Sequence, residues 1–274
     1  MFSPYYAWDG RSQPSDHVSI NVALYGLKPG APNRWAMTER GEAALARTAD
    51  SFTVGPSQLS WEGSTLVVDV DEVTVPFPRR LRGQIRFTPS IWQPSSLVLD
   101  SKVRHRWWPY APAGHMEVRF EKPKLAWTGH GYADSNWGSA ALEADFKGWS
   151  WARAKTADGT ALLYDPLERS GRHKPVALHV GRDGIAIPFD PPPDVALDKG
   201  FWGVARSVRS EEPSRTKLIK TLEDAPFYTR NAVETVLNGE VCPAVHESLN
   251  LDRFKNPVVK LMLPFRMPRR TRWP

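Results

Sequence analysis

The sequence has very little cysteine: Cys242 is the single one among 274 residues. One thiol cannot form a disulfide within the chain, and the chain has no cysteine-based zinc pattern. No run approaches the ~18 consecutive apolar residues of a membrane-spanning helix. The N-terminus also lacks the basic and apolar regions of a secretory signal. These absences predict a cytoplasmic protein without disulfides, in which any contact with a membrane is peripheral.

Most of the chain has no excess of positive charge. Seven basic residues and one acid lie between Leu251 and Pro274, so this basic tail carries the whole formal charge of +6. Residues 1–250 hold 29 basic and 29 acidic side chains. A protein that follows a phosphate backbone needs a basic surface, which such a balance does not supply. The charge pattern therefore argues against a nucleic-acid partner.

Common signatures of cofactor, metal and nucleophile chemistry are missing. The chain has no glycine-rich phosphate loop, no zinc-protease motif and no G-x-S-x-G elbow. His173 and His179 lack paired ligand spacing, so ordinary surface or core roles are favoured. Cys242 lies beside Pro243 and is predicted to be a small buried hydrophobe. For His246 and its neighbour Glu247, a structural role is favoured over a catalytic one.

Aromatic residues, proline and glycine are abundant, with 12 Trp, 25 Pro and 19 Gly. Frequent Pro and Gly divide the chain into short elements. Asn-Gly, Asp-Gly and Glu-Gly pairs lie between β-forming segments, which is typical of tight hairpin turns. The pattern predicts an all-β fold of antiparallel hairpins with little helix. Four hairpin turns are expected, at Glu62-Gly63, Asp158-Gly159, Asp183-Gly184 and Asn238-Gly239.

Other segments give more local expectations. Thr38–Ala49 has a helix N-cap and several helix formers, so a helix is predicted there. Residues 190–198 are rich in proline and acid, which predicts a long loop. Pro243 inside a predicted strand indicates an edge or a bulge. The polar segment Glu121–Lys124 is the expected boundary between two halves, residues 1–122 and 123–274.

Two segments concentrate residues that could carry chemistry. In VRHRWWPYAP (Val103–Pro112), His105 and Trp107 are two residues apart and would share one face of a strand. In GHGYADSNWG (Gly129–Gly138), Tyr132 and Asp134 have the same spacing. On neighbouring strands the two segments would bring an imidazole, an indole, a phenol and a carboxyl together. The alternative is that the first segment is core and the second a turn.

Longer blocks of the sequence resemble the carotenoid 1,2-hydratases, which are also called hydroxyneurosporene synthases. The resemblance covers essentially the whole chain. Its blocks include FSPYYAW (Phe2–Trp8), RWAMTERG (Arg34–Gly41), VRHRWWPYAP, GHGYADSNWGSAALEADFKGWSWARA (Gly129–Ala154), HESLNLDRF (His246–Phe254) and MLPFRMPRR (Met262–Arg270). It implies two lipocalin-like β-barrel or sandwich halves. It also implies further strands before Phe2 in relatives, so the first half is expected to lack its first strands.

The resemblance further implies a function and a site. The family adds water to the C1–C2 terminal double bond of acyclic carotenes such as neurosporene and lycopene, and it uses no metal or cofactor. The implied catalytic set falls on His105, Trp107, Tyr132 and Asp134. A buried Asp134 would donate the proton, because burial keeps a carboxyl protonated. His105 is expected to orient and reload Asp134, and the rings of Trp107 and Tyr132 to stabilise the cation.

Two other functions stay open. A lipocalin-like protein that only holds a carotene or another isoprenoid would have the same fold without needing Asp134. A cyclase or cycloaddition catalyst acting on a polyene would also suit the barrel and its Trp content. The basic tail has two possible roles. It is expected to be either a peripheral anchor on the inner or intracytoplasmic membrane or a last strand with a solvated basic end.

Overall fold

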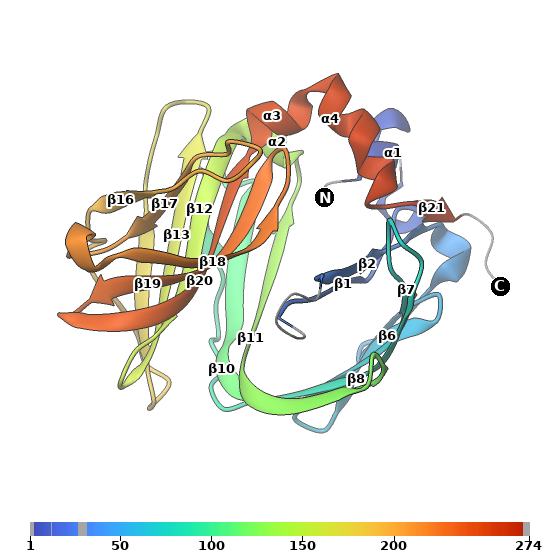
Figure 1. Ribbon diagram of the computed structural model, residues 1–274, viewed down its shortest axis with the longest axis horizontal. Helices are drawn as coiled ribbons and strands as arrows, with labels where there is room; N and C mark the ends of the chain where they lie inside the picture. The colour runs from blue at the N-terminus through green and yellow to red at the C-terminus, as the bar shows by residue number, and fades with distance from the viewer. Residues whose placement is uncertain (1–2, 12, 27–31, 271–274) are drawn as a thin grey trace. The chain divides into compact units, whose positions relative to one another are not determined.

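The computed structural model describes residues 3–11, 13–26 and 32–270. The described chain forms two compact units (Figure 1). Unit 1 comprises residues 1–90, 114–131 and 260–274, and unit 2 comprises residues 91–113 and 132–259. Strands β10 (His105–Lys122) and β11 (Leu125–Gly138) contribute residues to both units. Residues 123–124 form the turn between these two strands, and the division into halves 1–122 and 123–274 stays a prediction.

Unit 1 is built mainly from an antiparallel sheet in the order β11-β10-β8-β7-β6-β5-β4. Its core contains Val54, Val70, Leu81, Val118 and Phe120 from these strands. Its elements are α1 (Pro4–Trp8), β1 (Asn21–Leu24), β2 (Arg34–Met37), β3 (Glu39–Arg40), β4 (Leu45–Arg47), β5 (Ser51–Val54), β6 (Ser57–Glu62), β7 (Thr65–Val73), β8 (Arg80–Pro89), β21 (Arg269–Arg270) and the 3-10 helices Pro14–Asp16, Glu42–Ala44 and Leu263–Phe265.

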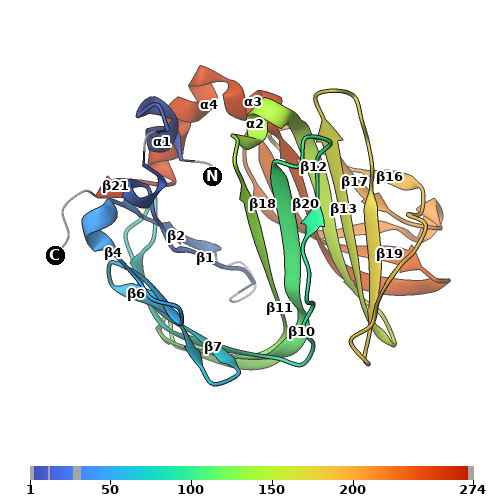
Figure 2. The same ribbon diagram turned by 180° about the vertical axis from the view of Figure 1, so that it is seen from behind.

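Unit 2 is built on a seven-stranded antiparallel sheet in the order β15-β14-β13-β12-β20-β19-β18 (Figure 2). Its other strands are β9, which pairs with β10, and the β16–β17 hairpin. Its elements are β9 (Leu97–Val98), α2 (Leu142–Asp145), β12 (Phe146–Lys155), β13 (Gly159–Glu168), β14 (Val176–Gly181), β15 (Ala186–Pro188), β16 (Asp194–Leu197), β17 (Arg206–Arg209), the 3-10 helix Pro213–Arg215, β18 (Lys217–Asp224), β19 (Tyr228–Leu237), β20 (Glu240–Asn250) and α3 (Leu251–Lys255). Helix α4 (Pro257–Met262) follows α3.

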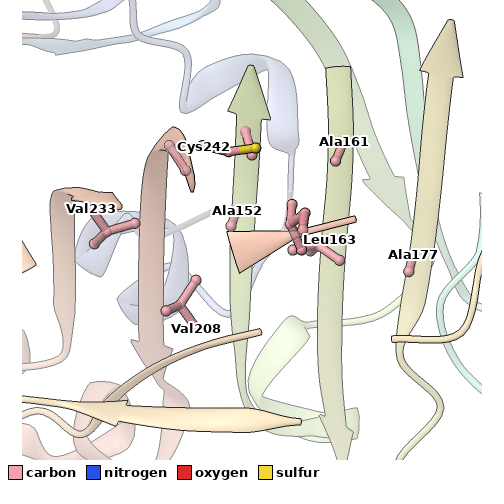
Figure 3. Packing of buried hydrophobic residues seen from close by; sticks show 10 residues of the cluster. Ala152, Ala161, Leu163, Ala177, Val208, Val233 and Cys242 are labelled. Atoms are coloured by element: carbon pink, nitrogen blue, oxygen red, sulfur yellow. The ribbon is translucent and has the colours of Figure 1, made fainter. Parts of the chain in front are cut away.

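The two faces of the unit 2 sheet have different roles. Small and apolar side chains on one face, including Ala152, Leu163 and Val233, pack with Val208 of β17 (Figure 3). The residues that alternate with them in β12 and β13 point to the opposite face, because successive side chains of a strand alternate. That opposite face carries Trp149, Trp151, Arg153 and Tyr164, and it is the face that forms the candidate site.

The predicted hairpins and the predominance of antiparallel strands are confirmed. Strands β19 and β20 meet at Asn238-Gly239, where both residues have positive φ (52° and 75°), as a type I′ turn requires. Pro243 pairs with Glu234 of β19, whereas the ladder with β12 begins at Ala244. Pro243 therefore lies at a locally unpaired edge, where its missing N–H is harmless.

Two local expectations are wrong. Thr38–Ala49 is not one helix: it contains β3, a 3-10 turn at Glu42–Ala44 and β4, since Gly41 interrupts the helical pattern and pairing with β5 recruits Leu45–Arg47. Residues 190–198 are not entirely loop, because β16 pairs with β17 there. The described part of the basic tail is mostly helical, and only Arg269–Arg270 form a short strand, parallel to β3. Residues 271–274 lie outside the described residues.

Candidate active site

Asp134 accepts two hydrogen bonds on the same carboxylate oxygen. The indole Nε1 of Trp107 donates to Oδ2 at 2.8 Å, and the hydroxyl of Tyr132 donates to Oδ2 at 2.9 Å. Trp107 comes from β10, while Tyr132 and Asp134 are two residues apart on the neighbouring strand β11. Three of the four residues singled out by the sequence therefore form one hydrogen-bonded group, and they all belong to unit 2.

Aromatic side chains of the unit 2 sheet surround this group. The ring centroids of Trp107 and Tyr164 are 5.1 Å apart, and those of Tyr132 and Trp151 are 5.4 Å apart. The guanidinium of Arg153 lies 5.6 Å from the centroid of the Tyr132 ring. Trp107 is 0% exposed, so its π face is covered by protein. Tyr132 and Trp151 are only partly buried, so a substrate could reach their rings.

Burial governs the electrostatics of the site. Desolvation raises the pKa of Asp134 above its ordinary value, although the hydrogen bonds from Trp107 and Tyr132 oppose the rise. The negative charge of Glu247 raises it further. Burial, and next the charge of Asp134, raise the pKa values of Tyr132 and Tyr164, so both phenols stay protonated. The surroundings of Asp134 thus shift its equilibrium toward the neutral, proton-carrying form, relative to an exposed aspartate.

A row of four side chains crosses the sheet beside Asp134. Arg230 lies directly opposite Glu247 in the β19–β20 ladder, Glu247 opposite Trp151 in the β20–β12 ladder, and Trp151 opposite Tyr164 in the β12–β13 ladder. Directly opposed residues share one face of a sheet. Arg230 donates from Nε to Oε1 of Glu247 at 2.8 Å, and its Nη2 lies 2.6 Å from the same oxygen.

His105 has a different carboxylate as its partner. Its Nε2 lies 2.8 Å from Oδ2 of Asp145 at the end of α2, and its ring packs against Phe146. The side chain of Asp145 is 3% exposed and also pairs with Arg104 and Lys102. Burial acts to raise the pKa of Asp145, but the hydrogen bonds from His105 and Arg104 outweigh it and lower that pKa. Within the described residues, no hydrogen bond joins His105 to Asp134, and a role of His105 in orienting or reloading Asp134 stays a prediction.

The remaining candidates from the sequence have structural surroundings. His246 is 0% exposed, and its Nε2 lies 2.8 Å from the carbonyl oxygen of Ser207. Burial lowers the pKa of His246 to about 4, so the ring is neutral. Burial raises the pKa of the Cys242 thiol to about 12, which confirms a buried, unreactive cysteine. His173 and His179 pair with Asp165 and Asp158, as ordinary histidines do.

The sequence did not single out Tyr164, Trp151 or Asp145. One signal was present for Trp151: Trp149, Trp151 and Arg153 alternate in GWSWARA, so a strand places them on one face. Tyr164 and Asp145 had no such signal, since the pairing of β12 with β13 and the approach of α2 to His105 are long-range events.

Comparison with known proteins places this geometry in a family. The model of the carotenoid hydratase CrtC family matches residues 1–274. The chain belongs to the CrtC family of carotenoid hydratases. Family members are enzymes of the hydro-lyase class, and this chain is accordingly an enzyme of carotenoid hydration.

Named relatives agree with this assignment. The chain is 48% identical over 273 residues to the acyclic carotenoid 1,2-hydratase of Thiocapsa roseopersicina, with 98% of this chain and 67% of the relative covered. It is 41% identical over 274 residues to the acyclic carotenoid 1,2-hydratase of Cereibacter sphaeroides, with 100% and 96% covered. The crystal structure of CghA with Sch210972 has a TM-score of 0.50 at 12% identity, covering 85% of this chain and 84% of CghA. That likeness concerns the fold alone and agrees with the lipocalin-like, all-β architecture of this family member.

Proposed function

We propose that this CrtC-family enzyme adds water to the C1–C2 terminal double bond of acyclic carotenes such as neurosporene and lycopene. The product is a tertiary 1-hydroxy carotenoid. One observation carries the proposal: Asp134, a carboxyl group with a raised pKa, receives two hydrogen bonds on one oxygen among aromatic rings. The acyclic carotenoid 1,2-hydratases that the chain resembles indicate the substrate class.

Asp134 is the proposed proton donor. An isolated alkene has no carbonyl to polarise, so hydration begins with protonation of C2 by a strong, desolvated acid. Because Trp107 and Tyr132 both donate to Oδ2, we place the acidic proton on Oδ1. Transfer of this proton forms the C2–H bond and leaves a tertiary cation at C1. The same two donors then stabilise the Asp134 carboxylate.

The proposed stabilisers of the cation are the accessible rings. Tyr132 and Trp151 are partly exposed, and a desolvated contact between a cation and such a ring is worth about 2 kcal/mol. Trp107 was expected to share this role, but its burial suits it better to holding Asp134. Water then attacks C1. The reaction needs no redox or group-transfer chemistry, and the proposal invokes no cofactor.

We also propose that the C-terminal segment contacts the membrane in which carotenes dissolve. Val258 and Leu261 are three residues apart on α4 and are 65% and 64% exposed, and Phe265 is 74% exposed. Lys260 lies among them. Exposed apolar side chains beside basic ones suit an anionic bilayer surface. In the described residues, no helix is long and apolar enough to cross a membrane.

The decisive experiment is hydration in ¹⁸O-labelled water. The wild-type protein, supplied with lycopene or neurosporene in anionic liposomes, is expected to give a product heavier by one labelled water. Asp134→Asn keeps the shape of the carboxyl without its acidic proton, and hydration should fall about 10²- to 10⁴-fold. Substrate bound but unchanged by the wild type would instead favour the carotenoid-holding alternative. Equal turnover by Asp134→Asn would remove Asp134 as the acid.

A further inference from the structure

A second carboxylate lies on the face of the unit 2 sheet that carries the candidate site. Glu247 on β20 occupies the row Arg230, Glu247, Trp151, Tyr164. Its neighbour in that row, Trp151, packs on Tyr132, and Tyr164 packs on Trp107. Tyr132 and Trp107 both donate to Asp134, so two residues, Trp151 and Tyr132, lie between Glu247 and the acid. The charge of Glu247 also acts on both Asp134 and Tyr164.

The surroundings of the two carboxyl groups differ in a way that suits opposite roles. Glu247 has the guanidinium of Arg230 against Oε1. Its side chain is 19% exposed, so water can reach it. Among the described residues, the groups hydrogen-bonded to Asp134 are neutral: the indole of Trp107, the phenol of Tyr132 and the side-chain amide of Asn136. Two carboxyl groups in such different surroundings can act as an acid and a base in one reaction.

We propose that Glu247 is the base of the reaction, which binds the attacking water and accepts its proton. This proposal rests on the proposed hydration. Asp134 gives its proton to C2 as the π bond breaks, and the water oxygen bonds to C1. One proton of that water passes to a carboxylate oxygen of Glu247, so the product is the neutral alcohol. Glu247 then returns a proton to Asp134 through solvent, which restores both groups.

Glu247 could instead have a purely structural role, because it forms an ion pair with Arg230. In that case Glu247 would only hold Arg230 or keep Asp134 protonated through its charge. The charged and titratable groups around it that matter for this distinction are Arg230 on β19, Arg153 on β12, Tyr164 on β13, and Tyr132 and Asp134 on β11.

Azide separates the two roles, because an azide ion captures a cation without losing a proton. The experiment compares wild type, Glu247→Ala and Glu247→Gln with lycopene in liposomes, with and without sodium azide. Water addition by both variants should fall about 10²- to 10⁴-fold. In Glu247→Ala, azide should restore turnover and give a 1-azido product, since Asp134 still protonates C2. Glu234→Gln is the matched control: it lies on the same face, beyond Arg230 on β19, and should behave as wild type.

Three outcomes would overturn the proposal. Water addition by Glu247→Gln within threefold of wild type would show that no base is needed at this position. Loss of both the water and the azide products by a folded Glu247→Ala would assign the residue to protonation or to architecture. An alkaline limb that merely moves to lower pH in Glu247→Gln, with the maximal rate retained, would show an electrostatic effect on Asp134. A wild-type protein that adds no water would instead contradict the proposed function itself.

Discussion

Trp107 donates its indole N–H to Oδ2 of Asp134 at 2.8 Å, and Trp107 is 0% exposed. A hydrogen bond made by a fully buried ring is not in competition with water, so it fixes the direction of the carboxyl group. The hydroxyl of Tyr132 donates to the same oxygen. Both contacts favour the ionised carboxylate, whereas desolvation favours the neutral acid, and desolvation is the larger effect. The pKa of Asp134 therefore depends on the balance between these hydrogen bonds and desolvation, which single substitutions can change.

Tyr132→Phe removes one of the two donors while keeping the ring. With one less hydrogen bond to the ionised form, the pKa of Asp134 should rise further. Activity requires the protonated acid, so the alkaline limb of the pH–rate profile should move to higher pH. The rate below that limb should fall about tenfold, because the carboxyl is less well held. The measurement is kcat/KM for hydration against pH; a limb that moves to lower pH would contradict this account.

Asp134→Asn should stabilise the protein while removing its activity. The folded-state pKa of Asp134 is raised above its ordinary value, so its stability contribution is present below that ordinary value and is lost as the pH rises through the folded pKa. At neutral pH the wild type must either retain a proton or bury a charge. The neutral amide of the Asp134→Asn variant has no charge to bury and no proton to retain. The free energy of unfolding of the variant should therefore be about 1 kcal/mol higher than that of the wild type. Thermal unfolding at pH 5 and pH 8 checks this: the gain should be larger at pH 8.

The sequence predicts part of this site. Trp107, Tyr132 and Asp134 meet as expected, because strand alternation fixes faces locally and the two motifs lie on neighbouring strands. The partner of His105 was not predictable in this way. Asp145 is the last residue of the short helix α2, and its approach to β10 depends on packing between segments that are 40 residues apart in sequence.

In the fold, too, some local features could be predicted from the sequence, whereas long-range pairing could not. The Asn238-Gly239 turn was predictable because positive φ at two successive residues restricts the residue types. The strand at Leu45–Arg47 was not, since helix formers dominate that segment and only pairing with β5 overrides their preference. Likewise helix α3 follows a strand without any glycine or proline break, and its start depends on Asn250, whose side chain accepts a hydrogen bond from the Arg253 N–H as the N-cap.

Asp145→Asn tests whether His105 only holds β10 in place or also affects the acid Asp134. The buried Asp145 carboxylate holds His105, Arg104 and Lys102, and removal of a buried charge partner costs about 3 kcal/mol. The pKa of Asp145 is lowered in the fold, so its contribution is present above the ordinary value and is lost as the pH falls through the folded pKa. The variant should be less stable at pH 7, as measured by urea unfolding. If His105 only positions β10, the alkaline limb of hydration should stay in place; a displaced limb would couple His105 to Asp134.

The C-terminal segment can be tested apart from catalysis. The double substitution Leu261→Glu with Phe265→Glu places charge on two side chains that are 64% and 74% exposed. Stability should change by less than about 0.5 kcal/mol for each surface substitution, whereas binding to anionic liposomes should weaken at least tenfold. Ile187→Glu, at an apolar side chain that is 58% exposed on β15, is the matched control. Equal loss of liposome binding in the control, or none in the double variant, would remove this segment as the membrane contact.

His246 should make the protein sensitive to acid. Burial lowers the pKa of His246 from 6.5 to about 4 in the fold, where its ring nitrogens meet the Ser207 carbonyl and the Asn231 amide. The unfolded chain therefore binds more protons than the folded protein between these two values, and stability rises with pH across that window. The contribution is complete above pH 6.5 and falls by about 3 kcal/mol as the pH drops to about 4. Urea unfolding of wild type and His246→Gln from pH 7 to pH 4 measures it. Between pH 7 and pH 4, the wild type should lose about 3 kcal/mol more unfolding free energy than His246→Gln. Equal losses in the two proteins would show that another group controls the response to acid.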